Sequence, residues 1–184
     1  MSQPIRTRGR ERGFGLIIII MIVAFMLAVG MLLLTVTGTS PKAADSLRLQ
    51  GMAFDAAESG FNAAWSILND NFLNKIYSSF GGQYRTTYGG APGLDDPASP
   101  NYFRSLTDEQ IVADVAADNT AANPALFRSE PLATDPRCEF TVFLINDEAP
   151  GTITGDDNDC ILVCIGRGPR NTYKRLEIVI EAGS

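Results

Sequence analysis

One long apolar run dominates the pattern of hydrophobic and polar positions along the chain. It extends from Phe14 to Thr37 without a charged residue. About 20 apolar residues suffice for a helix to cross the hydrocarbon core of a bilayer, so the pattern predicts a transmembrane helix over residues 14–37. The mean hydropathy of +0.04 for the whole chain conceals this segment, because the remaining residues resemble an ordinary soluble domain in composition.

A second apolar pattern follows at helical spacing. Bulky apolar residues separated by seven, four, three, four and four positions form one stripe: Phe54, Phe61, Trp65, Leu68, Phe72 and Ile76. The spacing predicts an amphipathic helix that buries this stripe, and nearby alanines favour close packing. Between the two patterns, Gly38-Thr39-Ser40-Pro41 predicts a bend or a locally melted turn. Gly81-Gly82 marks the predicted helix end, so the whole helix is expected over residues 14–80.

Residues 81–137 are rich in Gly, Pro, Asp, Asn and Ser, which predicts a variable loop region. One short helix is expected inside it, because Thr107 and Gln110 form a capping box ahead of Ile111, Val112 and Val115. Four aromatic residues of this region either form an exposed contact patch or cover the stripe of the long helix. The second use is favoured. These residues are Tyr84, Tyr88, Tyr102 and Phe103.

The last part of the chain, residues 138–184, predicts an antiparallel sheet. Strands are expected over residues 138–146, 160–167 and 173–181, because β-branched and aromatic residues are dense there and the third segment alternates apolar and charged positions. Residues 168–171 predict a tight connection between the last two strands. The expected fold class is therefore α+β, a long N-terminal helix whose amphipathic half packs on a small antiparallel sheet.

Charge divides the chain in the same way as hydropathy. The segment before Phe14 carries four arginines and one glutamate, a net +3, whereas the rest carries 11 basic and 20 acidic residues, a net −9. Positive charge beside the apolar run predicts a cytoplasmic N-terminus and an exported C-terminal part. The acidic exported part argues against nucleic-acid binding. The chain has no histidine, the residue that most often serves as a general acid or base. Catalysis is therefore less expected, and neither an enzyme activity nor a cofactor is predicted.

Three cysteines lie in the part predicted to be exported, where disulfides form. Cys160 and Cys164 are about 13 Å apart along one strand at ~3.3 Å per residue, too far to bond to each other. If a disulfide forms, Cys138 therefore bonds to one of them, and a hairpin register that sets it opposite Cys164 is weakly favoured. The alternative is three buried, reduced thiols. A metal site is not predicted, because the cysteines have no CxxC spacing.

The acidic loop at residues 155–159, Gly-Asp-Asp-Asn-Asp, invites comparison with calcium-binding loops. It lacks the full alternation of an EF-hand loop and the distant bidentate glutamate. A solvated acidic turn is the favoured interpretation.

The junction between the charged leader and the apolar run carries a more specific signal. The run is too long for a cleaved secretory signal and no Ala-x-Ala site follows it, while an ordinary signal anchor fits the hydropathy equally well. Arg12-Gly13-Phe14, with glycine closing the leader and an aromatic residue opening the run, resembles the signal of type IV prepilins. The resemblance implies that a prepilin peptidase cuts between Gly13 and Phe14, removes residues 1–13 and methylates the new terminus.

A second segment strengthens the resemblance. Met52-Ala-Phe-Asp-Ala-Ala-Glu-Ser-Gly60 is similar to a segment found at this distance from the membrane in PilX-type minor pilins, and it places Glu58 as a candidate assembly residue. A solvated helix position is the slightly favoured use of Glu58. One residue departs from the pattern. Most pilins carry glutamate at the fifth residue of the mature chain, where this sequence has Ile18, and within the family that departure is typical of tip subunits.

The resemblance implies a minor, tip or priming pilin of a type IV pilus. Its partners would be other minor and major pilins, the prepilin peptidase and the inner membrane, and its work would be mechanical, in pilus assembly, adhesion and motility. Two alternatives remain open. One is a minor pseudopilin of a type II secretion system, and the other is a membrane-anchored binding protein or enzyme that never polymerises.

Overall fold

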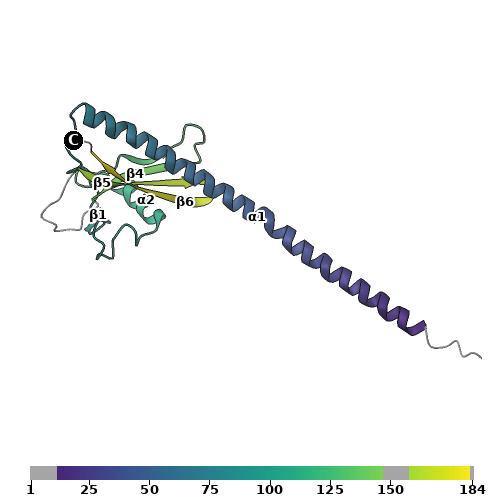
Figure 1. Ribbon diagram of the computed structural model, residues 1–184. Coiled ribbons are helices and arrows are strands. Elements are labelled where there is room, and N and C mark those ends of the chain that lie inside the picture. The colour runs from purple at the N-terminus through teal and green to yellow at the C-terminus, as the bar shows by residue number, and fades with distance from the viewer. Residues whose placement is uncertain (1–11, 147–157, 183–184) are drawn as a thin grey trace, which may run out of the picture. The chain divides into compact units, whose positions relative to one another are not determined.

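The computed structural model describes residues 12–146 and 158–182, except for the side chains of residues 12–14 and 36–41 (Figure 1). The chain divides into two compact units, Met1–Ser46 and Leu47–Ser184. Helix α1, Arg12–Leu73, contributes to both. The fold class is α+β, with a long apolar N-terminal helix and a small antiparallel sheet, as the sequence predicts.

Helix α1 runs unbroken through residues 38–41, so the predicted melted turn is wrong. A proline in a helix removes a backbone hydrogen bond and crowds the preceding turn, but Lys42, Ala43 and Ala44 directly after Pro41 are good helix formers.

Helix α1 also ends earlier than predicted, at Leu73 instead of residue 80. The amide of Lys75 donates to the carbonyl of Phe72 (3.0 Å) and that of Ile76 to the carbonyl of Asn71 (2.8 Å). This is the hydrogen-bond pair of a Schellman motif, whose turning residue is left-handed and usually glycine. Here Lys75 takes that conformation, with φ of 56°. Gly81-Gly82 therefore follows the helix at a distance instead of ending it.

The second unit is built on a four-stranded antiparallel sheet in the order β3-β4-β5-β6. Its strands are β3 (Phe127–Pro131), β4 (Glu139–Ile145), β5 (Asp159–Gly168) and β6 (Thr172–Glu181). The three predicted strands are confirmed, whereas β3 lies inside the region predicted to be loops. A single 3₁₀ turn, Pro169–Asn171, joins β5 to β6 and confirms the predicted tight connection.

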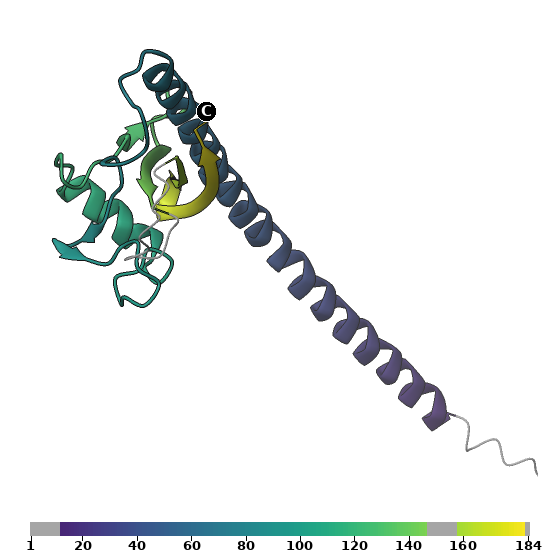
Figure 2. The same ribbon diagram turned by 60° about the vertical axis from the view of Figure 1, so that its left-hand side comes forward.

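The sheet is covered on both faces (Figure 2). Even-numbered residues of β4 and β5, such as Val142 and Leu162, pack toward α1, and odd-numbered ones, such as Phe143 and Val163, pack toward helix α2 (Asp108–Ala117). The central residues of both strands are buried and form nearly continuous apolar runs, a pattern of strands covered on both faces.

The face that α1 turns to the sheet includes only part of the predicted aromatic stripe. Phe54 is 41% exposed, Trp65 51% and Ile76, past the helix end, 66%, whereas Leu68 is buried and Phe61 and Phe72 are partly buried. The fully buried positions are instead small: Ala53, Ala56, Ala57 and Ala64. Small side chains let the helix backbone approach the strands closely at these positions, while Leu68, Phe61 and Phe72 pack where the contact is wider.

The loop region carries more structure than its composition indicates. The short helix is confirmed as α2, and its capping box forms between Thr107 and Gln110. A small hairpin pairs β1 (Thr87–Tyr88) with β2 (Ala91–Pro92). The predicted role of the aromatic residues is confirmed only for Tyr84, which packs in the cluster beneath α1. The other three, Tyr88, Tyr102 and Phe103, belong to the cluster on the opposite face of the sheet.

Candidate functional site

The apolar half of α1 is the first candidate site. Residues Gly15–Thr35 have a mean hydropathy of 3.2 over their most apolar window, and this is the one helix in the described part of the chain that is long and apolar enough to cross a membrane. Its large side chains are all exposed, including Ile18 at 43%. An apolar surface of this kind is stable only in lipid or against other apolar surfaces.

The predicted processing residues lie where this helix begins. The backbones of Gly13 and Phe14 belong to the first turn of α1, which starts at Arg12. Residues 1–11 and the side chain of Phe14 lie outside the described part, which therefore does not include the geometry of the junction.

The two predicted assembly residues belong to different units. Ile18 lies in the first unit, and Glu58 lies in the second, exposed on the part of α1 that packs on the sheet. Its neighbour Ala57 is fully buried. Glu58 therefore faces away from the sheet contact, as expected for either a solvated residue or a group reserved for another chain.

A close contact between α1 and β5 fixes the helix on the sheet, and sequence reasoning missed it. A Cβ atom at Gly166 would overlap the carbonyl oxygen of Ala53 and lie 2.5 Å from the amide nitrogen of Ala57. At Gly60, on the helix, an added Cβ would lie 3.0 Å from side-chain atoms of Phe140 and Val142. The close contact therefore needs both glycine on the strand and small residues on the helix. The spacing of the alanines is the sequence pattern that could have predicted it.

A buried ion pair lies on the face of the sheet that α2 covers, and no sequence pattern predicted it. Arg85 is fully buried and donates to the carboxylate of Asp114 on α2 at 2.7 Å. The same guanidinium donates to the carbonyls of Asp118 (2.8 Å) and Asn123 (2.9 Å). The other oxygen of Asp114 accepts from the amide of Gly89 at 2.7 Å. The pair thus ties the β1–β2 hairpin to α2.

The cysteines do not form the predicted disulfide. Cys138, Cys160 and Cys164 are all buried free thiols. The predicted register is wrong, because Val142, not Cys138, lies opposite Cys164. Cys138 is four residues from that position, about 13 Å along the strand, beyond the reach of a disulfide. Burial raises the pKa of Cys164 to about 12, so this thiol is a core residue and not a reactive group.

The acidic loop falls mostly outside the described residues, which resume at Asn158. Within the described ranges, no group of three or more potential metal-ligating His, Cys, Asp or Glu side chains occurs. Asp159 opens β5 directly opposite Glu181 of β6, and one buried carboxylate oxygen of Asp159 has no hydrogen-bond partner in the described part of the chain.

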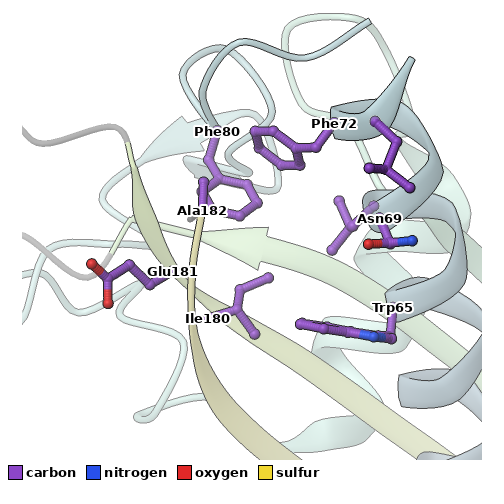
Figure 3. A pocket seen from close by; sticks show the side chains of 9 residues that line it. Trp65, Asn69, Phe72, Phe80, Ile180, Glu181 and Ala182 are labelled. Atoms are coloured by element: carbon purple, nitrogen blue, oxygen red, sulfur yellow. The ribbon is translucent and has the colours of Figure 1, made fainter. Parts of the chain in front are cut away.

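A cavity of about 340 Å³ lies between the end of α1 and the end of β6 (Figure 3). Trp65, Leu68 and Phe72 line it from the helix, and Phe80 and Ile180 line it from the following loop and from β6. The side chain of Ile180 points toward Trp65, whereas the carboxylate of Glu181 points away to the other face of the strand (Figure 3).

No protein-family model matches the chain, and no curated protein and no solved structure matches it either. Function is therefore inferred from the residues and their geometry.

Proposed function

We propose that this protein is a minor pilin, a tip or priming subunit of a type IV pilus that assembles with other minor and major pilins after prepilin peptidase processing. The observation that carries the proposal is Gly13-Phe14 at the boundary between an arginine-rich leader and one continuous helix. In a pilin the apolar helix is not a disposable signal. It remains attached to the folded domain, and here α1 contributes directly to the core of the second unit.

Processing gives the apolar helix its assembly role. The leader holds four arginines, which keep the N-terminus at the cytoplasmic surface. A cut after Gly13 removes that anchor of charge and leaves Phe14 as the first residue of an apolar helix. The exposed side chains of residues 15–35 can then exchange lipid for the apolar helices of neighbouring subunits.

Ile18 supports a terminal position in the filament. The carboxylate that most pilins place here pairs with a neighbouring subunit's terminal amine. Ile18 offers no charge, and an unpaired charge buried among apolar helices is costly. A subunit without this carboxylate is suited to a site where one side of its helix lacks the usual neighbour.

Two alternatives share part of this support. A minor pseudopilin would use the same junction and helix, and it would differ only in assembling into a type II secretion system instead of a type IV pilus. A membrane-anchored binding protein that never polymerises would use the apolar helix and not the junction.

Cleavage at the junction is the experiment that tests the proposal. The full chain is expressed with and without a prepilin peptidase, together with Gly13→Leu and, as a matched control within the leader, Gly9→Leu. The wild-type and Gly9→Leu chains are expected to shorten only when the peptidase is present, and Gly13→Leu is expected to stay intact. Equal behaviour of the two variants would reject processing at Gly13 and favour the simple anchor.

A further inference from the structure

The two edges of the sheet differ in how well they are protected. Strand β3 has five residues, an irregular register between Phe127 and Glu130, and a proline at its end, all features that discourage pairing with another strand. Strand β6 has ten residues in continuous register with β5, and no proline. No strand pairs with its outer edge within residues 12–146 and 158–182. The outer edge of β6 is therefore an open template for backbone hydrogen bonds.

The apolar cavity lies beside this open edge. An added strand would lie about 4.8 Å from β6, and every second side chain would turn to the face that carries α1. There it would meet Ile180 and the half-exposed ring of Trp65. The cavity could accept one or two bulky apolar side chains, which gives the edge a means of selecting its partner.

The opposite face of the same strand end carries negative charge. Glu181 is exposed and lies directly opposite Asp159, and like charges in this position disfavour each other. One buried oxygen of Asp159 has no hydrogen-bond partner among the described residues, which adds to the negative character of this end. A lysine or arginine on the next strand, facing Glu181, would offset both carboxylates.

We propose that the outer edge of β6 docks an extended segment of a different protein, in which basic residues alternate with bulky apolar residues. The backbone of that segment would continue the sheet, its apolar residues would enter the cavity beside Trp65, and a basic residue would face Glu181. The proposal does not depend on the pilin assignment, because it rests on the second unit alone.

A second copy of this chain is a poorer occupant. The only basic residue of β6 on the face of Glu181 is Arg175. Its guanidinium already bonds to the carboxylate of Asp108 and to the carbonyls of Phe103 (3.0 Å) and Leu106 (3.1 Å). Antiparallel pairing of two β6 strands would therefore bring no free cation to Glu181.

The sole tryptophan of the chain provides a direct readout, because Trp65 lines the cavity. The full chain in nanodiscs is titrated with an eight-residue peptide that alternates arginine with isoleucine or valine, and Trp65 emission is followed. A peptide of the same composition with its arginines and apolar residues in two blocks is the control. The alternating peptide is expected to change the emission saturably, with an affinity at least about tenfold higher than that of the blocked peptide.

Two charge reversals locate the site. Glu181→Lys is expected to weaken the alternating peptide about threefold to tenfold at low salt, because an attraction becomes a repulsion. Glu130→Lys makes the same change on the β3 edge and is expected to leave the affinity unaltered. Equal affinities for the two peptides, an equal effect of the two variants, or no saturable change would overturn the proposal. A change in Trp65 emission on concentrating the chain alone, with dimer formation, would overturn it in favour of a second copy.

Discussion

Gly166 on β5 lies directly beneath the carbonyl oxygen of Ala53 on α1, and there is no space between them for a side chain. Because Ala53 and Ala57 are both fully buried, the helix meets Gly166 through backbone and methyl groups. This contact sets how deeply the second half of α1 sits on its sheet. It therefore couples the helix to the folded domain within the second unit.

Replacing Gly166 tests this coupling. Gly166→Ala is expected to lower the free energy of unfolding by about 1–3 kcal/mol or more, because backbone must move to admit the methyl group. Gly51→Ala on α1, where nothing lies within 4 Å of the added Cβ, is expected to raise it by about 0.5–1 kcal/mol. Denaturant unfolding of the detergent-solubilised chain, followed by circular dichroism, measures both. Similar effects of the two substitutions would show that α1 does not pack closely on β5.

The buried ion pair predicts an asymmetry between core and surface charges. Asp114→Ala leaves the guanidinium of Arg85 buried without its counter-charge and is expected to cost about 3–5 kcal/mol. Arg104→Gln breaks a bridge to Glu177 whose arginine is 51% exposed, and it is expected to cost less than about 1 kcal/mol. Thermal unfolding of the two variants under one condition compares them. A smaller loss in Asp114→Ala than in Arg104→Gln would contradict the buried position of Arg85.

The thiols predict a labelling pattern. Burial raises the pKa of Cys164 to about 12, so the folded chain at pH 8 holds almost no thiolate at this residue and should resist alkylation there. After denaturation without reductant, all three cysteines should react, because none is in a disulfide. Intact mass spectrometry counts the added groups. Only one added group before reduction, rising to three after it, would establish the disulfide that the structure lacks.

Acid stability should depend on Asp135. The side chain and backbone N–H of Arg137 lower the pKa of Asp135 to about 2. Because the folded pKa lies below the unfolded value of about 3.9, this stabilisation is present above about pH 4 and is lost as the pH falls toward 2. Asp135→Asn should therefore lower the melting temperature at pH 5 and have a smaller effect at pH 2.5. Asp70→Asn, an exposed site on α1, is the control, and an equal effect of Asp135→Asn at both pH values would contradict the pairing.

Much of the fold could be predicted from the sequence, because strong local patterns determine it. The apolar run, the capping box at Thr107 and the three C-terminal strands each carry a signal within a few residues. Strand β3 carried none, since its Arg128, Ser129 and Glu130 read as loop. It forms by pairing with the next strand, β4, where Phe127 lies opposite Val142 and Pro131 opposite Glu139.

The contact surfaces could not be predicted in the same way. Helical spacing placed Trp65 in the buried stripe, but this residue is half exposed. The closest contact is made instead by Ala53 and Ala57, because Gly166 allows the strand to come close. The Arg85–Asp114 pair and the open edge of β6 likewise depend on which segments meet in space. The processing site at Gly13 and Phe14 depends on sequence position alone, and it stays a prediction.

The N-terminus of the mature protein tests the central claim most directly. The protein is extracted from the membranes of its native host, and the mass of its N-terminal fragment is determined. A minor pilin predicts that the chain begins at Phe14, with a methyl group on its amine and residues 1–13 absent. An intact Met1, or a first residue after Ser40, would contradict the assignment.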